Sequence, residues 1–224
     1  MIALLLAAAP IAEMPGGDAA RFAACAQMAK DNPKQALIEA QGWATRSRDV
    51  PARHCLGLAY AVNEQWGPAA VAFDEAASTA QSNHDGRAAS LWTQAGNAAL
   101  AADDPTRARI YLDDALNSPV LVGQMRGEAL LDRARADVAL NDLATARTDL
   151  DAGMGFVSED PFAWLMSAAL ARRQGDLDRA TKDIAEASKR APDDPDIGEE
   201  IAAIAAAKAA KAAPAMQPAP APPK

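Results

Sequence analysis

Between residues 164 and 192, apolar side chains recur at helical spacing in two short runs separated by Gly175 and Asp176. The apolar positions of the first run are Trp164, Leu165, Ala168 and Ala171, and those of the second are Leu177, Ala180, Ile184 and Ala187. The pattern predicts two short helices joined by a tight turn. Neither helix can bury its apolar stripe alone, so similar units are expected to stack on this one.

Similar units precede it along the chain. The alanines that open each predicted second helix are 33, 39, 38 and 34 residues apart, at Ala36, Ala69, Ala108, Ala146 and Ala180. Two insertions, near residues 82–86 and 117–123, account for the longer intervals. The sequence therefore predicts a repeat with a period close to 34 residues.

One segment carries the residues of a known repeat family at the family's spacing: Leu56, Gly57, Tyr60, Ala69, Phe73 and Ala76. It resembles a tetratricopeptide repeat (TPR), a helix-turn-helix unit of about 34 residues. The resemblance implies an all-α fold, a right-handed superhelical solenoid of about five helical hairpins with a C-terminal capping helix. Small residues such as Gly57 would let paired helices approach closely, while Trp92, Trp164, Tyr60 and Phe73 would fill the core.

We expect the repeat array to span residues 18–195. The expected units lie near residues 18–49, 50–86, 89–122, 127–160 and 161–194. Residues 196–213 have isoleucines at helical spacing and are expected to form the capping helix. Residues 214–224 alternate Pro and Ala, which predicts an extended, disordered tail.

The apolar start of the chain, with a linker to residue 17, is similar to the apolar region of a secretory signal. It is too short for a stable membrane span, which needs about 20 residues. No Lys or Arg precedes the apolar run, and Pro10 interrupts the simplest cleavage sites. We expect export to a bacterial periplasm, with a cytoplasmic location as the alternative.

Composition narrows the candidate chemistry. Aromatic residues make up 4% of the chain, which favours closely packed helices over sheets. Acidic residues outnumber basic ones by 30 to 22, so a nucleic acid partner is not expected. The acidic pairs and single acids mostly lie at expected turns and helix starts, where we interpret them as caps: Asp103, Asp104, Asp113, Asp114, Asp149, Asp151, Asp193 and Asp194.

The sequence offers no catalytic, metal or cofactor site. It has only two histidines, and it lacks a phosphate-binding loop, a nucleophile elbow and metal-ligand spacing. His54 and Cys55 are adjacent on one helix and point about 100° apart, so they are poorly placed to share a metal. We therefore expect a protein that is not an enzyme.

Cys25 and Cys55 leave two interpretations open. They fall on the first helices of adjacent hairpins, which are neighbours in this family, so export would permit a disulfide between them. The alternative is a pair of buried thiols that pack as small apolar groups.

In the family that the chain resembles, first helices line a concave groove that receives a peptide or a partner's helix. The resemblance places eight residues there: Arg21, His54, Thr93, Asn97, Arg135, Leu165, Arg172 and Arg173. This partly cationic set favours an acidic partner or a C-terminal carboxylate. Members that bind chaperone C-termini carry Lys, Asn and Arg at places that here hold His54, Leu58, Gln94, Glu128 and Asp132, so that activity is not carried over.

The resemblance thus implies a non-catalytic scaffold that binds an unidentified protein or peptide. A structural or self-associating component of a cell-envelope assembly is the alternative function.

Overall fold

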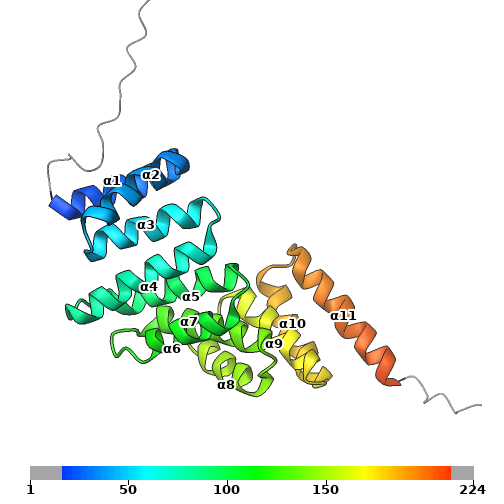
Figure 1. Cartoon of the computed structure of the whole chain (residues 1–224). Helices are drawn as coiled ribbons and strands as arrows, with labels where there is room; N and C mark the ends of the chain where they lie inside the picture. Colours follow the sequence, from blue (N-terminus) through cyan, green and yellow to red (C-terminus); the bar gives the residue numbers. More distant parts are fainter. Residues whose placement is uncertain (1–16, 213–224) are drawn as a thin grey trace, which may run out of the picture. The chain divides into compact units, whose positions relative to one another are not determined.

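The computed structural model describes residues 17–212, and all regular structure in that range is α-helical (Figure 1). The all-α prediction is confirmed. The helices are α1 (Gly17–Asp31), α2 (Pro33–Arg46), α3 (Val50–Val62), α4 (Trp66–Ser82), α5 (Ala88–Ala101), α6 (Pro105–Leu116), α7 (Gly123–Ala139), α8 (Leu143–Met154), α9 (Pro161–Arg173), α10 (Leu177–Arg190) and α11 (Pro195–Ala212). The signal-like residues 1–16 and the tail 214–224 lie outside the described residues.

The chain divides into two compact units, at residues 1–156 and 157–224. In the described part of unit 1, α1 to α8 pair as successive antiparallel hairpins, and each hairpin packs against the next (Figure 1). Alanines from α4 and α5 dominate the largest core, in which Phe73, Trp92 and Leu112 supply the bulk. Small side chains let neighbouring helices approach closely, and the few large ones fill the remaining space.

Acidic and amide side chains begin many of these helices, as the sequence predicted for Asp104. Asp104 Oδ1 accepts the backbone N–H of Arg107, and Asp142 and Asp176 cap α8 and α10 in the same way. The interpretation as caps is wrong for Asp113, Asp114, Asp149 and Asp151, which lie inside α6 and α8, and Asp149 shows the difference most clearly. Its side chain is buried between helices and binds Arg133, because it lies in the interior of α8 and faces α7.

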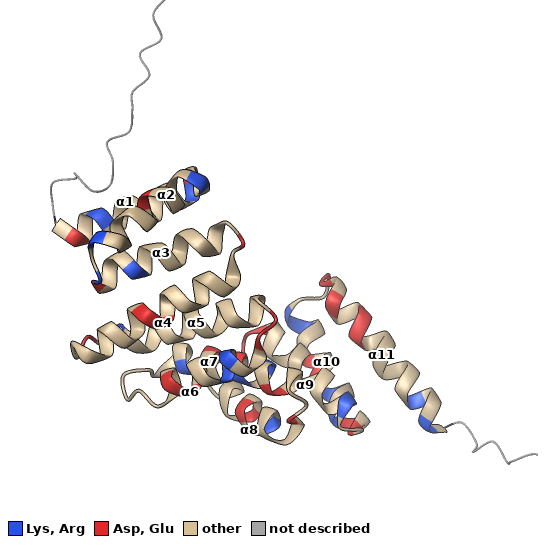
Figure 2. Cartoon of the chain, viewed as in Figure 1, with Lys and Arg blue, Asp and Glu red and all other residues tan. Residues whose placement is uncertain are grey.

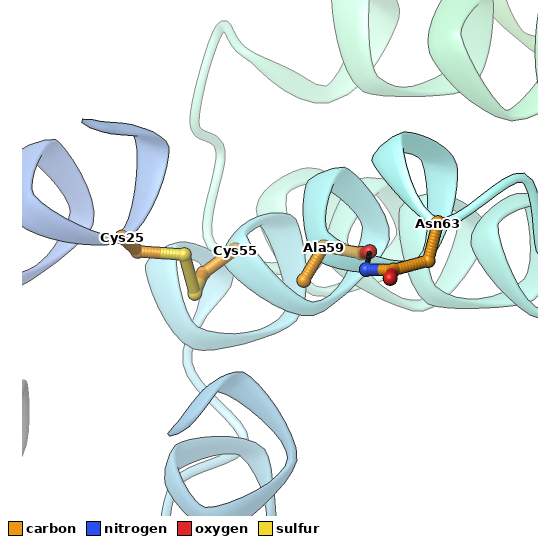
Figure 3. Close-up of a disulfide and its surroundings, with 4 residues drawn as sticks. All are labelled: Cys25, Cys55, Ala59 and Asn63. Carbon is orange, nitrogen blue, oxygen red and sulfur yellow. Dashed lines mark hydrogen bonds between the residues drawn. A yellow bond between two sulfur atoms is a disulfide. The ribbon is translucent and has the colours of Figure 1, made fainter. Parts of the chain in front are cut away.

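Among the contacts that join the first hairpin of unit 1 to the second are a disulfide, drawn in Figure 3, and a hydrogen bond from Asn63. Cys25 of α1 and Cys55 of α3 form a disulfide, with Cα atoms 6.0 Å apart and both side chains fully buried. Near the other end of α3, Asn63 Nδ2 donates to Pro33 O (2.8 Å) and to Ala59 O (2.7 Å). These contacts fix α3 against both helices of the small first hairpin.

In unit 2, the hairpin α9–α10 is covered by α11. Ile197 and Ile204 of α11 are buried in the same core as Ala168 and Ile184. Arg172 of α9 also binds Glu200 of α11 through both carboxylate oxygens, at 2.6 and 3.0 Å. The amphipathic spacing of the α11 isoleucines thus serves to bury one face of this helix on the hairpin.

The predicted core aromatics divide into two groups. Trp92 and Phe73 are buried, as expected. Tyr60 and Trp164 are only half-buried. Trp164 Nε1 donates to Ser158 O (2.7 Å), and the Arg190 guanidinium lies 5.1 Å from the Trp164 ring centroid, so this ring packs at the surface of unit 2. Across residues 17–212, no helix has both the length and the apolar character that crossing a bilayer requires.

Candidate partner-binding surface

Side chains from α1, α3, α5 and α7 form a candidate surface on unit 1, which we call the first-helix surface. We define it by Arg21, His54, Thr93, Asn97 and Arg135 of the sequence prediction, with Phe22, Gln94 and Asp132, which contact them. Contacts between successive first helices connect these residues across the hairpins.

His54 of α3 contacts side chains of α1, α4 and α5. Its ring stacks on Phe22 with centroids 4.6 Å apart and meets the edge of Phe73 at 5.9 Å. His54 Nε2 lies 3.0 Å from Gln94 Oε1. Burial lowers the pKa of His54, although the hydrogen bond to Gln94 acts in the opposite direction. A neutral imidazole in this position donates to the amide and remains a packing element.

Asn97, Asp132 and Arg135 form a second group, between α5 and α7. Arg135 Nη1 is 3.1 Å from Asp132 Oδ1, and the Asn97 side chain also bonds to this carboxylate. Burial raises the pKa of Asp132, while Arg135 and Asn97 oppose that shift. Asn97 and Arg135 are exposed, whereas Asp132 is half-buried beneath them. The group therefore presents amide and guanidinium groups that Asp132 orients.

Arg21 and Thr93 are held by contacts within unit 1. The Arg21 guanidinium lies 4.1 Å from the centroid of the buried Trp43 ring, an arrangement typical of a cation–π contact. Thr93 Oγ1 donates to Ala89 O (3.1 Å) within α5, so its hydroxyl proton is already used. Both residues contribute shape to the first-helix surface more than charge.

The remaining predicted residues belong to unit 2. Leu165 is half-buried against the core of that unit, and Arg173 is exposed in the last turn of α9. Arg172 is bound to Glu200, so its charge is compensated by α11. This pairing was not predicted from the sequence, because the capping helix was recognised by its isoleucines alone.

Gln94, Asp132 and Phe22 are the contact residues that the sequence prediction did not include. Gln94 and Asp132 stand at positions where the carboxylate-binding pattern of the family has other residues, so that pattern does not identify them. The signal that finds Gln94 and Asp132 is their position one helical turn before Asn97 and Arg135 on first helices, which places them beside the predicted set. Within residues 17–212, no three His, Cys, Asp or Glu side chains gather in a way that suits a metal ion.

The stacked hairpins and the first-helix surface define the class of fold: a tetratricopeptide-repeat array. The solved structure of YrrB, described as a TPR protein with an unusual peptide-binding site, aligns with a TM-score of 0.63 at 16% identity, over 81% of this chain and 91% of that one. A MamA RS-1 double mutant aligns with a TM-score of 0.65 at 16% identity, over 78% of this chain and 95% of that one.

A third similar structure is TTC0263, a thermophilic TPR protein of Thermus thermophilus. It aligns with a TM-score of 0.52 at 21% identity, over 84% of this chain and 99% of that one. No family model matches the chain, and no curated protein matches its sequence. The likeness is therefore one of fold.

Proposed function

We propose that this protein is a non-catalytic scaffold that binds a peptide or helix of a partner protein along the first-helix surface. The observation that carries the proposal is the series of contacts from Phe22 through His54 to Gln94, with the Asn97–Asp132–Arg135 group on the next helix pair. These contacts order polar groups from several hairpins before a partner arrives. Preorganised polar groups lower the entropic cost of binding.

The acidic character that the sequence suggested for the partner finds little support in the contacts. Arg135 is bound to Asp132, and Arg172 is bound to Glu200. Arg21 lies over Trp43 and 3.8 Å from Asp18. We therefore propose a partner that is recognised by hydrogen bonds and shape, with no requirement for net negative charge.

The test is a comparison of two double variants in affinity capture from an envelope extract. Asn97→Ala with Arg135→Ala removes exposed groups of the first-helix surface, and Lys34→Ala with Arg107→Ala removes polar groups from second helices. We expect the first variant to lose the partners that the parent captures and the second to keep them. Equal capture by both variants would contradict the choice of surface, and catalytic turnover that one substitution abolishes would contradict a scaffold.

A self-associating role is the second candidate, and Ile201, which is 47% exposed on α11, is the position at which we test it. Light scattering during size exclusion separates the two functions. A purified protein that assembles with increasing concentration, and that Ile201→Lys returns to a monomer, would favour assembly. A monomer at all concentrations favours the scaffold.

We further propose that the protein is exported to an oxidising compartment such as the periplasm. The Cys25–Cys55 disulfide supports this, because such bonds persist mainly outside the reducing cytoplasm. Mass measurement after alkylation without reductant checks it on protein recovered from its own cell. Two alkylated thiols would contradict export, and none would support it.

A further inference from the structure

The two insertions that interrupt the repeat period meet at one pocket of unit 1. The α4–α5 loop (83–87) and the α6–α7 loop (117–122) line a cavity of about 550 Å³ together with residues of α4, α5 and α6. This volume is in the range of small-ligand pockets. None of the lining residues belongs to the first-helix surface, so the pocket is separate from the site proposed above.

Both loops are held in place by their own contacts. Arg126 Nη1 donates to Leu116 O (3.0 Å) and Leu121 O (3.5 Å), which fixes the α6–α7 loop above the start of α7. Arg87 binds both carboxylate oxygens of Asp85 through Nε, at 3.0 and 2.9 Å, which closes the α4–α5 loop. The pocket walls are therefore preformed.

The uncompensated charge of the pocket is negative. Asp85 is neutralised by Arg87 and Asp113 is paired with Arg133 at 2.7 Å, whereas Asp114 of α6 lines the cavity near Asp74 without such a pairing with a basic side chain of the described residues. Burial raises the pKa of Asp114, and the Asp74 and Asp113 carboxylates raise it further. A cation placed beside Asp114 would relieve this repulsion and gain a charge-assisted hydrogen bond.

The other walls suit an aliphatic chain that ends in a cation. Trp92 forms one wall, and its Nε1–H donates to Asp74 Oδ1 (3.2 Å), which fixes the orientation of the indole. Pro119 and Val120 of the α6–α7 loop form an apolar rim, with Val120 53% exposed. Lysine and arginine side chains bury their stems on such surfaces while their charged ends find a carboxylate.

We propose that this pocket binds a lysine or arginine side chain in a basic segment of a partner protein. The stem of that side chain lies between Trp92 and the Pro119–Val120 rim, and its charged end reaches Asp114. Amide and hydroxyl groups of Gln81, Asn117 and Ser118 line the same cavity and are available to the adjoining peptide backbone. The net charge of −8 assists the approach of a basic segment.

The test uses the peptide acetyl-Val-Lys-Val-amide, titrated into the full chain with isotope-labelled protein and observed by NMR. We expect the Trp92 indole N–H and the amides of residues 117–120 to shift. The same peptide with an acetylated lysine should leave these signals unchanged. Asp114→Asn should weaken binding about tenfold, because the interaction lost is a hydrogen bond to a charged group.

Glu199→Gln is the matched control, because it removes one exposed acidic charge from unit 2. It should bind the peptide as the parent does. An equal loss of peptide affinity in Asp114→Asn and Glu199→Gln would mean that the peptide is attracted to the acidic protein in general. Equal binding of the acetylated peptide would show that the lysine charge is not recognised. Either result overturns the proposal. Spermidine that displaces the peptide at lower concentration would assign the pocket to a free polyamine and overturn the peptide assignment.

Discussion

The hairpins α3–α4 and α5–α6 are held together in a different way from α7–α8 and α9–α10. In α3–α4 and α5–α6, a glycine of one helix lies directly against a large side chain of its partner helix. A Cβ added to Gly57 would lie 2.5 Å from the Phe73 side chain, and one added to Gly96 would lie 2.6 Å from the Leu112 side chain. The corresponding residues of the other two hairpins are Ala134 and Ala168, opposite Leu150 and Ile184.

One residue before those alanines, the later hairpins carry polar pairs. Arg133 binds both oxygens of the buried Asp149, at 2.6 and 2.8 Å, and Ser167 Oγ donates to the buried Asp183 at 2.5 Å. Figure 2 shows the accompanying difference in charge: α5 carries no charged residue, whereas α7 carries both acidic and basic residues. One architecture thus accepts apolar interlocking or paired polar groups between its helices.

The two kinds of hairpin are therefore destabilised by different substitutions. An apolar interlock fails when volume is added, because nothing can move aside in a dense core. A buried polar pair fails when one partner is removed, because the other keeps its cost of burial. Asp137 of α7 illustrates that cost: it is fully buried, Arg109 Nη1 lies 3.6 Å away, and burial raises its pKa.

The largest effect is expected from Asp149→Ala. This change leaves the Arg133 guanidinium with Asp113, at 2.7 Å, and should lower the free energy of unfolding by about 3 kcal/mol. Chemical denaturation of the full chain measures the loss, and hydrogen exchange should locate it in α7 and α8. Asp113→Ala is the control, because that side chain is 48% exposed and should cost about 0–1 kcal/mol. An equal loss of unfolding free energy in the two variants would show that the buried Arg133–Asp149 pair stabilises the protein no more than the exposed pair does.

Gly57→Ala should have the next largest effect, about 2 kcal/mol of destabilisation through overpacking against Phe73. The second change Phe73→Leu should recover part of the loss, because it recreates the alanine–leucine pairing of residues 134 and 150. Thermal denaturation of the single and double variants measures both steps. A single variant as stable as the parent would mean that the two helices separate without cost at this position.

Sequence patterns predicted the apolar hairpins better than the polar ones. Gly57 and Phe73 carry the resemblance to the repeat family, and their contact follows from the family's spacing. Arg133, Asp149, Ser167 and Asp183 carried no such signal, because a charged residue in a helix is usually solvated and only the facing helix shows that it is buried.

The contacts of the candidate sites were likewise only partly predictable from the sequence. First-helix positions could be named from the repeat pattern, but the pairing of Arg172 with Glu200 joins residues 28 apart on helices whose packing the pattern does not specify. The two insertions were visible as longer intervals between repeats. That they line a common pocket follows only from the stacking of α4, α5 and α6.

Ser167→Ala should cost about 1.5 kcal/mol, less than Asp149→Ala. The variant removes a hydrogen bond to a buried carboxylate, but Asp183 keeps Arg179, whose Nε lies 3.2 Å away. The measurement is the unfolding free energy of unit 2, followed by hydrogen exchange in α9 and α10. Ser188→Ala is the control, since Ser188 Oγ donates to Ile184 O in its own helix. A larger loss at Ser188 than at Ser167 would contradict the role of the polar pair between the helices.

The smallest effect is expected at His54, a titrating side chain packed among the apolar contacts of α1, α3 and α4. Burial lowers its pKa in the folded protein, so the unfolded chain takes up the proton first as the pH falls. Stability should therefore decrease as the pH drops below the ordinary histidine pKa of about 6.5 and stop decreasing below the folded pKa.

His54→Gln should abolish this decrease, and His84→Gln, at an exposed position in the α4–α5 loop, should preserve it. Denaturation of the three proteins between pH 5 and pH 8 measures the slopes. Because His54 stacks on Phe22 and contacts Phe73, the protection factors for hydrogen exchange in α1 and α3 should fall with acid, while those in α9 and α10 change less. An equal loss of protection in α1, α3, α9 and α10 would show that His54 does not cause the pH sensitivity of the apolar hairpins.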